Sequence, residues 1–198
     1  MNSSIRTAVV GTAALCIALL ATPRNAAADG DDTPLMNLVA LTSQRLALAL
    51  PVARWKWANH QPITDKPRET ALLADVEKRA RAAGVDPAFA HTFFEDQIEA
   101  SKLMQAALFD QWSSSKPPEG PAPDLATSTR PALDRLTQSM IAGLARVQPL
   151  RDAPDCPLRL ARSVQNWKTM TRYDASATGP LATALAHICS SGGIGAVG

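Results

Sequence analysis

The spacing of apolar residues between prolines and glycines restricts this chain to helices. Apolar residues recur every three or four positions along most of the chain, and Pro and Gly interrupt the pattern at intervals. This spacing places apolar side chains on one face of an α-helix. Fifteen prolines and few alternating β-branched residues leave no convincing strand. The sequence therefore predicts an all-α, single-domain helical bundle of about six helices.

Proline, glycine and aspartate mark the expected ends of these helices. Gly84 is typical of a helix stop, and Asp86 followed by Pro87 is typical of an N-cap and a first helical residue. Pro51 lies inside the first helical run, where it is expected to kink the helix or interrupt its hydrogen bonding. The six helices are expected over residues 33–60, 68–83, 87–112, 124–147 (or from 128), 157–171 and 175–189.

The first 28 residues have the composition of a secretory signal. Arg6 supplies a short basic start, residues 7–22 are almost all apolar or small, and a run of alanines ends at Ala28. An uncleaved membrane anchor is the alternative, although the run is short and a cleavage site follows it directly. We expect a signal peptide over residues 1–28, cleaved near Ala28, and a secreted or periplasmic mature protein without membrane contact. The mature chain would comprise a flexible segment 29–34, a helical domain 35–189 and a disordered tail 190–198.

The charge of the mature chain excludes one class of partner. Removing residues 1–28 takes away Arg6 and Arg24 but no acidic residue, so the 20 Lys and Arg become 18, equal to the 18 Asp and Glu. Proteins that bind nucleic acids or anionic membranes by general electrostatic attraction carry an excess of Lys and Arg. We therefore expect neither nucleic acid nor a membrane surface as a partner.

Two cysteines remain in the mature chain. Cys16 lies in the apolar signal region, which leaves Cys156 and Cys189. In an oxidising compartment such a pair favours one intramolecular disulfide, with two free buried thiols as the alternative.

The stretch that follows Lys56 carries the most chemical information. A break marked by Pro62 comes next, and then a second basic residue, Arg68. About thirty residues later, Ser101 and Gln105 lie one helical turn apart. Cations that converge near neutral hydrogen-bonding groups suit a small, multiply anionic ligand better than a macromolecule.

This ordered set resembles the all-helical chorismate mutases, and in particular their secreted subclass. That family carries a Lys, then a Pro-Ile-x-Asp-x-x-Arg segment, then Ser or Thr and Gln or Glu at i and i+4 on a later helix. The resemblance extends from about residue 35 to 189. It implies a chorismate mutase II-like fold, a homodimer, and a disulfide in a similar C-terminal place. The matching residues are Arg45, Lys56, Pro62, Ile63, Asp65, Arg68, Ser101, Gln105 and Arg130.

The resemblance also implies a reaction, the concerted rearrangement of chorismate to prephenate without a cofactor or a metal. Such an enzyme must hold a dianion in its reactive conformer and stabilise charge on the breaking ether oxygen. Lys56 and Gln105 would be the catalytic donors to that oxygen. The substrate-binding residues would be Arg45, Arg130 and Arg68 for the carboxylates, Glu69 or the backbone near Asp65 for the ring hydroxyl, and Ser101 to orient a carboxylate.

Other interpretations of the same residues stay open at this level. Arg45 could be a solvated surface residue, Asp65 could be only a helix cap, and Lys56 could simply lie along its neighbouring tryptophans. Pro131 restricts Arg130 to extended backbone unless a helix begins nearby. The three histidines have no ligand spacing, so no metal site is expected. An exported helical binding protein without turnover, or an enzyme acting on isochorismate, are the competing functions.

Overall fold

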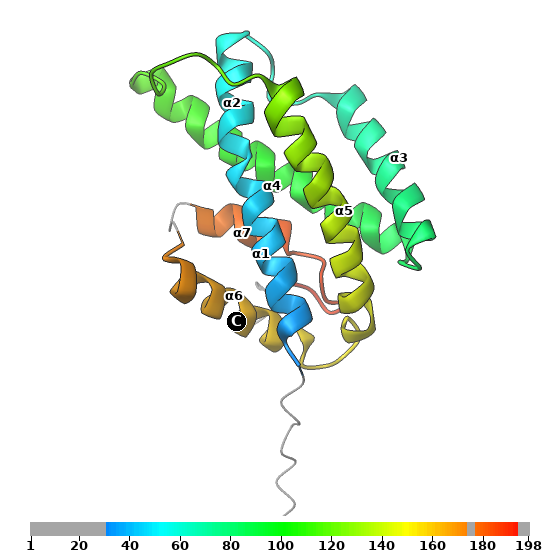
Figure 1. The fold of residues 1–198 in the computed structure, drawn as a ribbon. Coiled ribbons are helices and arrows are strands. Elements are labelled where there is room, and N and C mark those ends of the chain that lie inside the picture. Colours follow the sequence, from blue (N-terminus) through cyan, green and yellow to red (C-terminus); the bar gives the residue numbers. More distant parts are fainter. Residues whose placement is uncertain (1–30, 174–176, 194–198) are drawn as a thin grey trace, which may run out of the picture. The chain divides into compact units, whose positions relative to one another are not determined.

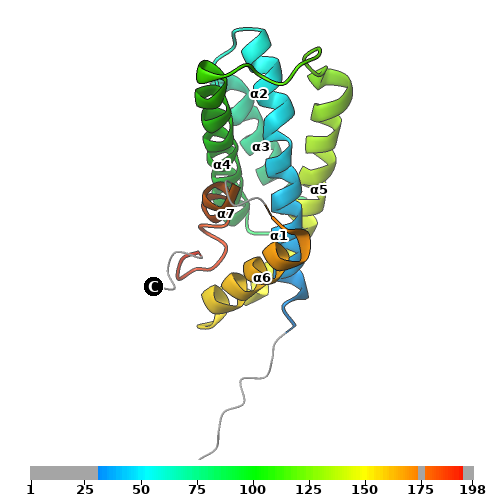
Figure 2. The same cartoon turned by 90° about the vertical axis from the view of Figure 1, so that its left-hand side faces the viewer.

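The computed structural model describes residues 31–173 and 177–193, which form an all-α domain (Figures 1 and 2). The predicted fold class is confirmed, and each of the six predicted helices has a counterpart. The predicted signal peptide, residues 1–28, lies outside the described residues. The elements are α1 (Thr33–Ala47), α2 (Ala49–Ala58), α3 (Lys66–Ala82), α4 (Pro87–Ser114), the π-turn η1 (Leu125–Thr129), α5 (Arg130–Val147), the 3-10 turn η2 (Gln148–Leu150), α6 (Cys156–Thr171) and α7 (Thr178–Ala184).

The first predicted helix is interrupted at Leu48, between α1 and α2. Pro51 has no N–H to donate to the carbonyl of Ala47, four residues earlier, and its ring collides with that carbonyl in a regular helix. α1 accordingly ends at Ala47. The Leu48 N–H turns back to the Arg45 carbonyl at 3.1 Å. The predicted interruption is therefore confirmed, and it lies one turn before the proline.

Aspartate side chains begin three of the helical segments. Asp65, Asp86 and Asp124 each accept a hydrogen bond from a backbone N–H two or three residues later, at 2.8–3.2 Å. These bonds satisfy N–H groups that have no partner inside the helix. Gly84 follows the end of α3 with a φ of +70°, a conformation in which only glycine is free of strain. The predicted stop and start at this corner are confirmed.

The long helix α4 is the central element of the domain. It packs against α1, α2, α3 and α7, and Figure 1 shows it crossing behind the blue-to-cyan pair α1 and α2. Its Phe93 and Phe94 rings are fully buried. α1 lies against α5, where a Cβ on Gly143 would meet a methyl of Leu38 at 3.3 Å, so the glycine permits close approach of the two helices.

The run Thr33–Ala58 is long and apolar enough to cross a membrane, judged by length and composition. Within the fold, however, α1 buries Leu35, Leu38 and Val39 completely or almost completely. It packs on α4, α5, α6 and α7. α1, the first part of this run, is therefore a core helix of the domain.

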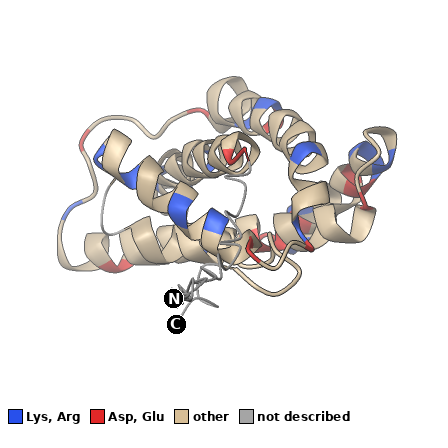
Figure 3. Ribbon diagram, turned by 90° about the horizontal axis from the view of Figure 1, so that it is seen from below, with Lys and Arg blue, Asp and Glu red and all other residues tan. Residues whose placement is uncertain are grey.

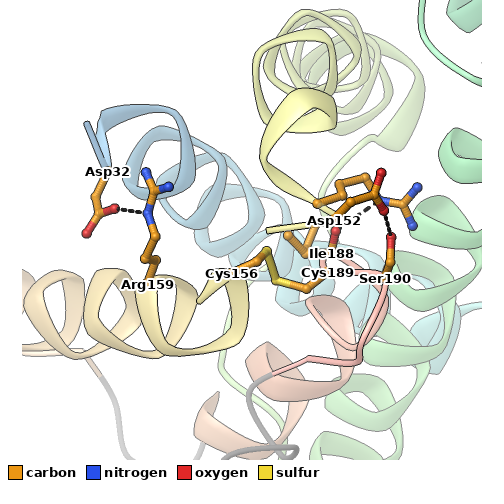
Figure 4. Close-up of a disulfide and its surroundings, with 8 residues drawn as sticks. Asp32, Asp152, Cys156, Arg159, Ile188, Cys189 and Ser190 are labelled. Carbon is orange, nitrogen blue, oxygen red and sulfur yellow. Dashed lines mark hydrogen bonds and ion pairs between the residues drawn. A yellow bond between two sulfur atoms is a disulfide. The ribbon is translucent and has the colours of Figure 1, made fainter. Parts of the chain in front are cut away.

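A disulfide joins the start of α6 to the turn after α7 (Figure 4). The Cα atoms of Cys156 and Cys189 lie 5.8 Å apart, and the two residues are only 1% and 2% exposed. The next residue, Ser190, donates its backbone N–H to the Arg151 carbonyl at 3.0 Å and its hydroxyl to Asp152. The predicted pairing is confirmed.

The last helix was predicted to be longer than it is. The first residues of the predicted disordered tail, 190–193, are ordered. α7 ends at Ala184 rather than at residue 189, and residues 185–187 form a turn. Cys189, five residues beyond the end of α7, is bonded to Cys156. Residues 190–193 of the predicted disordered tail form a second turn, closed by a bridge between Cys189 and Gly192. Residues 194–198 lie outside the described residues.

The prediction that residues 29–34 are flexible is wrong for residues 32–34. Thr33 and Pro34 already belong to α1. Arg159 of α6 is 7% exposed, and its Nε donates to the Asp32 carboxylate at 2.6 Å (Figure 4). A buried guanidinium requires such a partner, and this ion pair holds the start of α1.

Replacing both Cys156 and Cys189 by Ser should lower the free energy of unfolding by about 3–4 kcal/mol, because the unfolded chain then loses a cross-link. The cross-link closes a loop with a sequence separation of 33. Urea unfolding of residues 29–198, followed by circular dichroism without reductant, measures the difference. Dithiothreitol added to the native wild type should act slowly, because both sulfur-bearing residues are buried. Equal midpoints for the two proteins would show that the bridge contributes nothing to stability.

Candidate active site

A pocket of about 140 Å³ lies where α1 to α5 and η1 come together. All eight residues predicted to bind or act on the ligand line it. It also has an apolar wall that the sequence did not predict. The lining residues are Arg45, Leu48, Val52, Trp55, Lys56, Ile63, Asp65, Arg68, Glu69, Leu72, Ile98, Ser101, Lys102, Gln105, Leu125, Thr129, Arg130 and Leu133.

The charges of the pocket are unbalanced in favour of an anion. Five of its lining residues are cationic and two are acidic. Figure 3 shows Lys, Arg, Asp and Glu spread over the described helices, although α6 carries Lys and Arg but no acidic residue. The pocket cations also repel one another: Arg68 contributes to lowering the pKa of Arg45, and Arg68 and Lys102 contribute to lowering the pKa of Lys56. A ligand with several negative charges would relieve this repulsion.

Arg45 is the most deeply placed of these cations. Its Nε and Nη1 atoms are inaccessible to solvent and have no hydrogen-bond partner among the described residues, and its guanidinium carbon lies 5.7 Å from the centre of the Phe94 ring. Burial, helped by repulsion from Arg68, lowers the pKa of Arg45 to about 10, so it remains charged at neutral pH. The guanidinium of a solvated surface arginine would instead be hydrogen-bonded to water, so that alternative for Arg45 is not supported. Unused donors on a buried guanidinium match a planar carboxylate.

Lys56 is held by the chain break that follows its helix. Its Nζ donates at 2.5 Å to the carbonyl of Ile63, which lies in the break between α2 and α3. Burial lowers the pKa of Lys56, while Asp65 and Glu69 act in the opposite direction. An ammonium group has three donors, so Lys56 can still donate into the pocket.

The interruption at Leu48 lies between Arg45 and Lys56. In one ideal helix these two residues share a face but stand about 16 Å apart along the axis. Because α1 and α2 are separate helices, the two side chains enter the same pocket from different axes.

Asp65 and Glu69 form a reciprocal cap at the start of α3. Asp65 Oδ1 accepts from the Arg68 N–H, and Glu69 Oε1 accepts from the Asp65 N–H, both at 3.2 Å. The second oxygen of Glu69 accepts from Lys102 Nζ at 3.1 Å. Burial raises the pKa of Glu69, but the hydrogen bonds from Lys102 and from the Asp65 backbone outweigh burial, so the pKa lies below its usual value. Glu69 is therefore an ionised acceptor in a fixed orientation.

Gln105 and Ser101 form a hydrogen-bonded pair in the wall contributed by α4. Gln105 is 3% exposed. Its Nε2 donates to the carbonyl and the hydroxyl oxygen of Ser101, at 3.1 Å each. Its Oε1 is buried and has no partner among the described residues. One end of the amide is thus unsatisfied, which is unusual in a core and common where a ligand binds.

Arg130 begins α5 and Arg68 lies in the first turn of α3, and both are exposed at the edge of the pocket. Arg130 has helical backbone angles, φ −63° and ψ −47°, so the extended geometry that Pro131 could impose does not occur. Pro131 instead occupies the first turn of α5, where its missing N–H is harmless. The wide turn η1 precedes it, and the Arg130 N–H bonds to the Leu125 carbonyl five residues earlier.

Lys102 is the one charged lining residue that sequence reasoning missed. It lies next to Ser101 and three residues before Gln105, a spacing that places Lys102 and Gln105 on neighbouring positions of one helix face. That spacing was a usable signal. The apolar wall had none, because its members come from six segments that only the tertiary fold brings together.

The chain is similar to known proteins. Residues 36–106 match the family described as chorismate mutase type II. The chain is 34% identical over 172 residues to the secreted chorismate mutase of Mycobacterium tuberculosis, covering 85% of this chain and 84% of that protein. The secreted chorismate mutase of Mycolicibacterium smegmatis is 34% identical over 165 residues, with 82% and 90% covered.

Solved structures agree with these relatives. The crystal structure of chorismate mutase from Burkholderia thailandensis is 71% identical, with a TM-score of 0.77, covering 79% of this chain and 99% of that one. Chorismate mutase from Burkholderia phymatum is 33% identical, with a TM-score of 0.76, covering 80% and 97%. The resemblance stated from the sequence is confirmed: the chain belongs to the type II chorismate mutase family and is similar to its secreted members.

Proposed function

We propose that this protein is an exported chorismate mutase that rearranges chorismate to prephenate in the pocket lined by Arg45, Lys56 and Gln105. The observation that carries the proposal is the meeting of all eight predicted residues in one pocket with an excess of cations. Family membership supports the reaction, and the chemistry of the side chains supports their roles. The rearrangement is concerted, so the protein has to supply shape and charge and no nucleophile.

Arg45, Arg68 and Arg130 bind the two carboxylates of the substrate. Arg45 is placed to bind one carboxylate inside the pocket, because its buried Nε and Nη1 have unused donors. Arg68 and Arg130, at the exposed edge, bind the other. Guanidinium groups suit this task because two parallel N–H donors match a carboxylate and fix its orientation.

Lys56 and Gln105 donate to the ether oxygen, where negative charge develops as its bond to the ring breaks. Ile63 holds Lys56 in place, so the ammonium does not have to reorganise during the reaction. A half-turn of the Gln105 amide exchanges its oxygen and nitrogen. Ser101 would then donate its hydroxyl to Oε1, and the amide NH₂ would face the pocket. The single hydroxyl proton of Ser101 is then used on Gln105, so Ser101 serves the substrate by orienting that amide.

Glu69 accepts the hydrogen bond of the ring hydroxyl. Each of its oxygens already accepts one bond within the protein, and each keeps a further lone pair. The Asp65 carboxylate is used to cap α3, so Asp65 serves the site through the backbone and the helix that it starts. Leu72 and Ile98 belong to the apolar wall, which excludes water and strengthens the charge interactions.

Export and assembly complete the proposal. The composition of residues 1–28 supports a signal peptide cleaved near Ala28, and the relatives named as secreted support release from the cytoplasm. The mature chain would then consist of a short N-terminal segment, the helical domain and a short tail. The family resemblance supports a homodimer in which each protomer carries its own site.

Lys56→Ala and Gln105→Ala should each lower kcat about 10²–10³-fold, because each removes a donor to the developing charge. The loss of chorismate absorbance with purified residues 29–198 measures the rate. Lys116→Ala, at an exposed position outside the pocket, is the matched control and should keep full activity. Folded wild-type protein that turns over no chorismate would instead be a helical binding protein, and a preference for isochorismate would change the substrate.

The activity of the wild type should vary little between about pH 5 and 9, because a neutral amide donates at every pH in that range. Gln105→Glu should lose activity as the pH rises. Its carboxyl group can donate only when it is protonated, and burial keeps it protonated only up to a raised pKa. The pH profile of kcat for both proteins tests this. At the alkaline end the wild-type rate should fall as Lys56, whose pKa burial lowers, loses its proton. An equally steep profile for the wild type would contradict the role of Gln105.

Arg45→Met should raise KM for chorismate about ten- to a hundredfold, because a charged hydrogen bond to the substrate is lost. The same change should leave the melting temperature unchanged or raise it, since a buried charge with unused donors is replaced by a similar apolar volume. Steady-state kinetics and thermal unfolding measure the two effects. Arg135→Met, on the exposed face of α5, serves as the control. A fall in the melting temperature with no change in KM would make Arg45 a structural residue.

A further inference from the structure

Lys102 of α4 forms an ion pair with Glu69 of α3 in the wall of the pocket. Its Nζ lies 3.1 Å from Oε2 of Glu69 and 3.9 Å from Glu99. The side chains of Lys102 and Glu69 are only 20% and 16% exposed. A second cation, Lys66, also approaches Glu69, but it lies at 3.7 Å and its side chain is 79% exposed. Exposed pairs of this kind contribute little, whereas half-buried, hydrogen-bonded pairs are stronger.

The pair of Lys102 and Glu69 separates two cavities. Both residues, together with Ile98, line the pocket described above and also a groove between α3 and α4 on the other side. The carboxylate is fixed at both ends, by the Asp65 N–H on Oε1 and by Lys102 on Oε2. Without the bond from α4, only the bond within α3 would remain, and the carboxylate could turn toward the groove.

We propose that Lys102 is a positioning residue of the active site, which acts on the substrate through Glu69 by fixing the direction of its free lone pairs. The proposal rests on the proposed function, in which Glu69 accepts the ring hydroxyl of chorismate. Lys102 then ties the hydroxyl acceptor on α3 to the helix that carries Ser101 and Gln105. The two halves of the site are thereby kept in one geometry.

The charge of Glu69 depends on the same bond. Lys56 faces Glu69 from α2, Lys66 from its own helix and Lys102 from α4, with Glu99 behind Lys102. From α5, Arg130 lines the same pocket. Loss of Lys102 removes the hydrogen bond and the charge that most strongly keep the pKa of Glu69 low. The pKa of Glu69 would rise, and the ionised acceptor would be lost at a higher pH than in the wild type.

The test is a set of variants assayed for chorismate turnover across pH. Lys102→Met keeps the aliphatic stem but removes the charge, and it should lower kcat/KM about tenfold at pH 7. It should also move the acid limb of the profile to higher pH. Lys102→Arg should restore most of the activity and the wild-type acid limb. Lys66→Met removes the other, exposed cation beside Glu69, and it should change the activity and the acid limb much less than Lys102→Met does.

A double-mutant cycle separates positioning from direct contact with the substrate. In a Glu69→Ala background, Lys102→Met should change kcat/KM less than about twofold, because the hydrogen-bond acceptor of Lys102 is gone. Thermal unfolding of every variant shows whether the protein is folded at the assay temperature. Additive losses in the cycle, or an acid limb that does not move, would overturn the proposal. Wild-type protein without turnover would overturn the proposed function itself, which is a different result from an active wild type with an additive cycle.

Discussion

The burial of α4 on several sides is the constraint on which the rest of the structure depends. This helix packs against α1, α2, α3 and α7. Its first half buries Phe93 and Phe94 in the core, and its second half turns Ser101, Lys102 and Gln105 toward the pocket. Core and site are therefore parts of one rigid element. Any shift that loosens the aromatic packing also moves the amide that we propose as a donor, because the two lie on the same helix about three turns apart.

The pocket concentrates like charges in a place where water cannot screen them well. Such an arrangement opposes folding, because Arg45 is desolvated without a full set of hydrogen bonds and is repelled by Arg68. The fold tolerates it because the stabilising features lie elsewhere, in the core around α4 and in the buried disulfide between α6 and the turn after α7. When a dianion binds, Arg45 gains hydrogen bonds and an opposite charge, and both favour binding. This separation of stability from function is typical of active sites.

Three interruptions of the helices, each near a proline, determine where the charged side chains enter the pocket. Pro51 divides the first helical run, so that its two cations approach the pocket along different axes. The break that contains Pro62 brings the Ile63 carbonyl to Lys56. Before Pro131, the wide turn η1 leads directly into Arg130. Proline breaks regular hydrogen bonding wherever it lies inside a helix. In this chain the groups redirected in this way, the Ile63 carbonyl and the start of α5, hold Lys56 and place Arg130.

The sequence alone determined the all-α class, most helix ends and the identity of eight pocket residues. Helix ends depend on local rules, since Asp65, Asp86 and Gly84 act on backbone groups within a few residues of themselves. The site residues were identified because an ordered motif resembles a known family, and the disulfide because only two cysteines remain. Tertiary structure alone decided that two donor atoms of Arg45 are buried, that Lys102 meets Glu69, which segments form the apolar wall, and that α7 ends early. Each of these depends on contacts between segments far apart in the chain. Periodicity along one helix shows which face is apolar, but it does not show which side chain of another helix lies opposite.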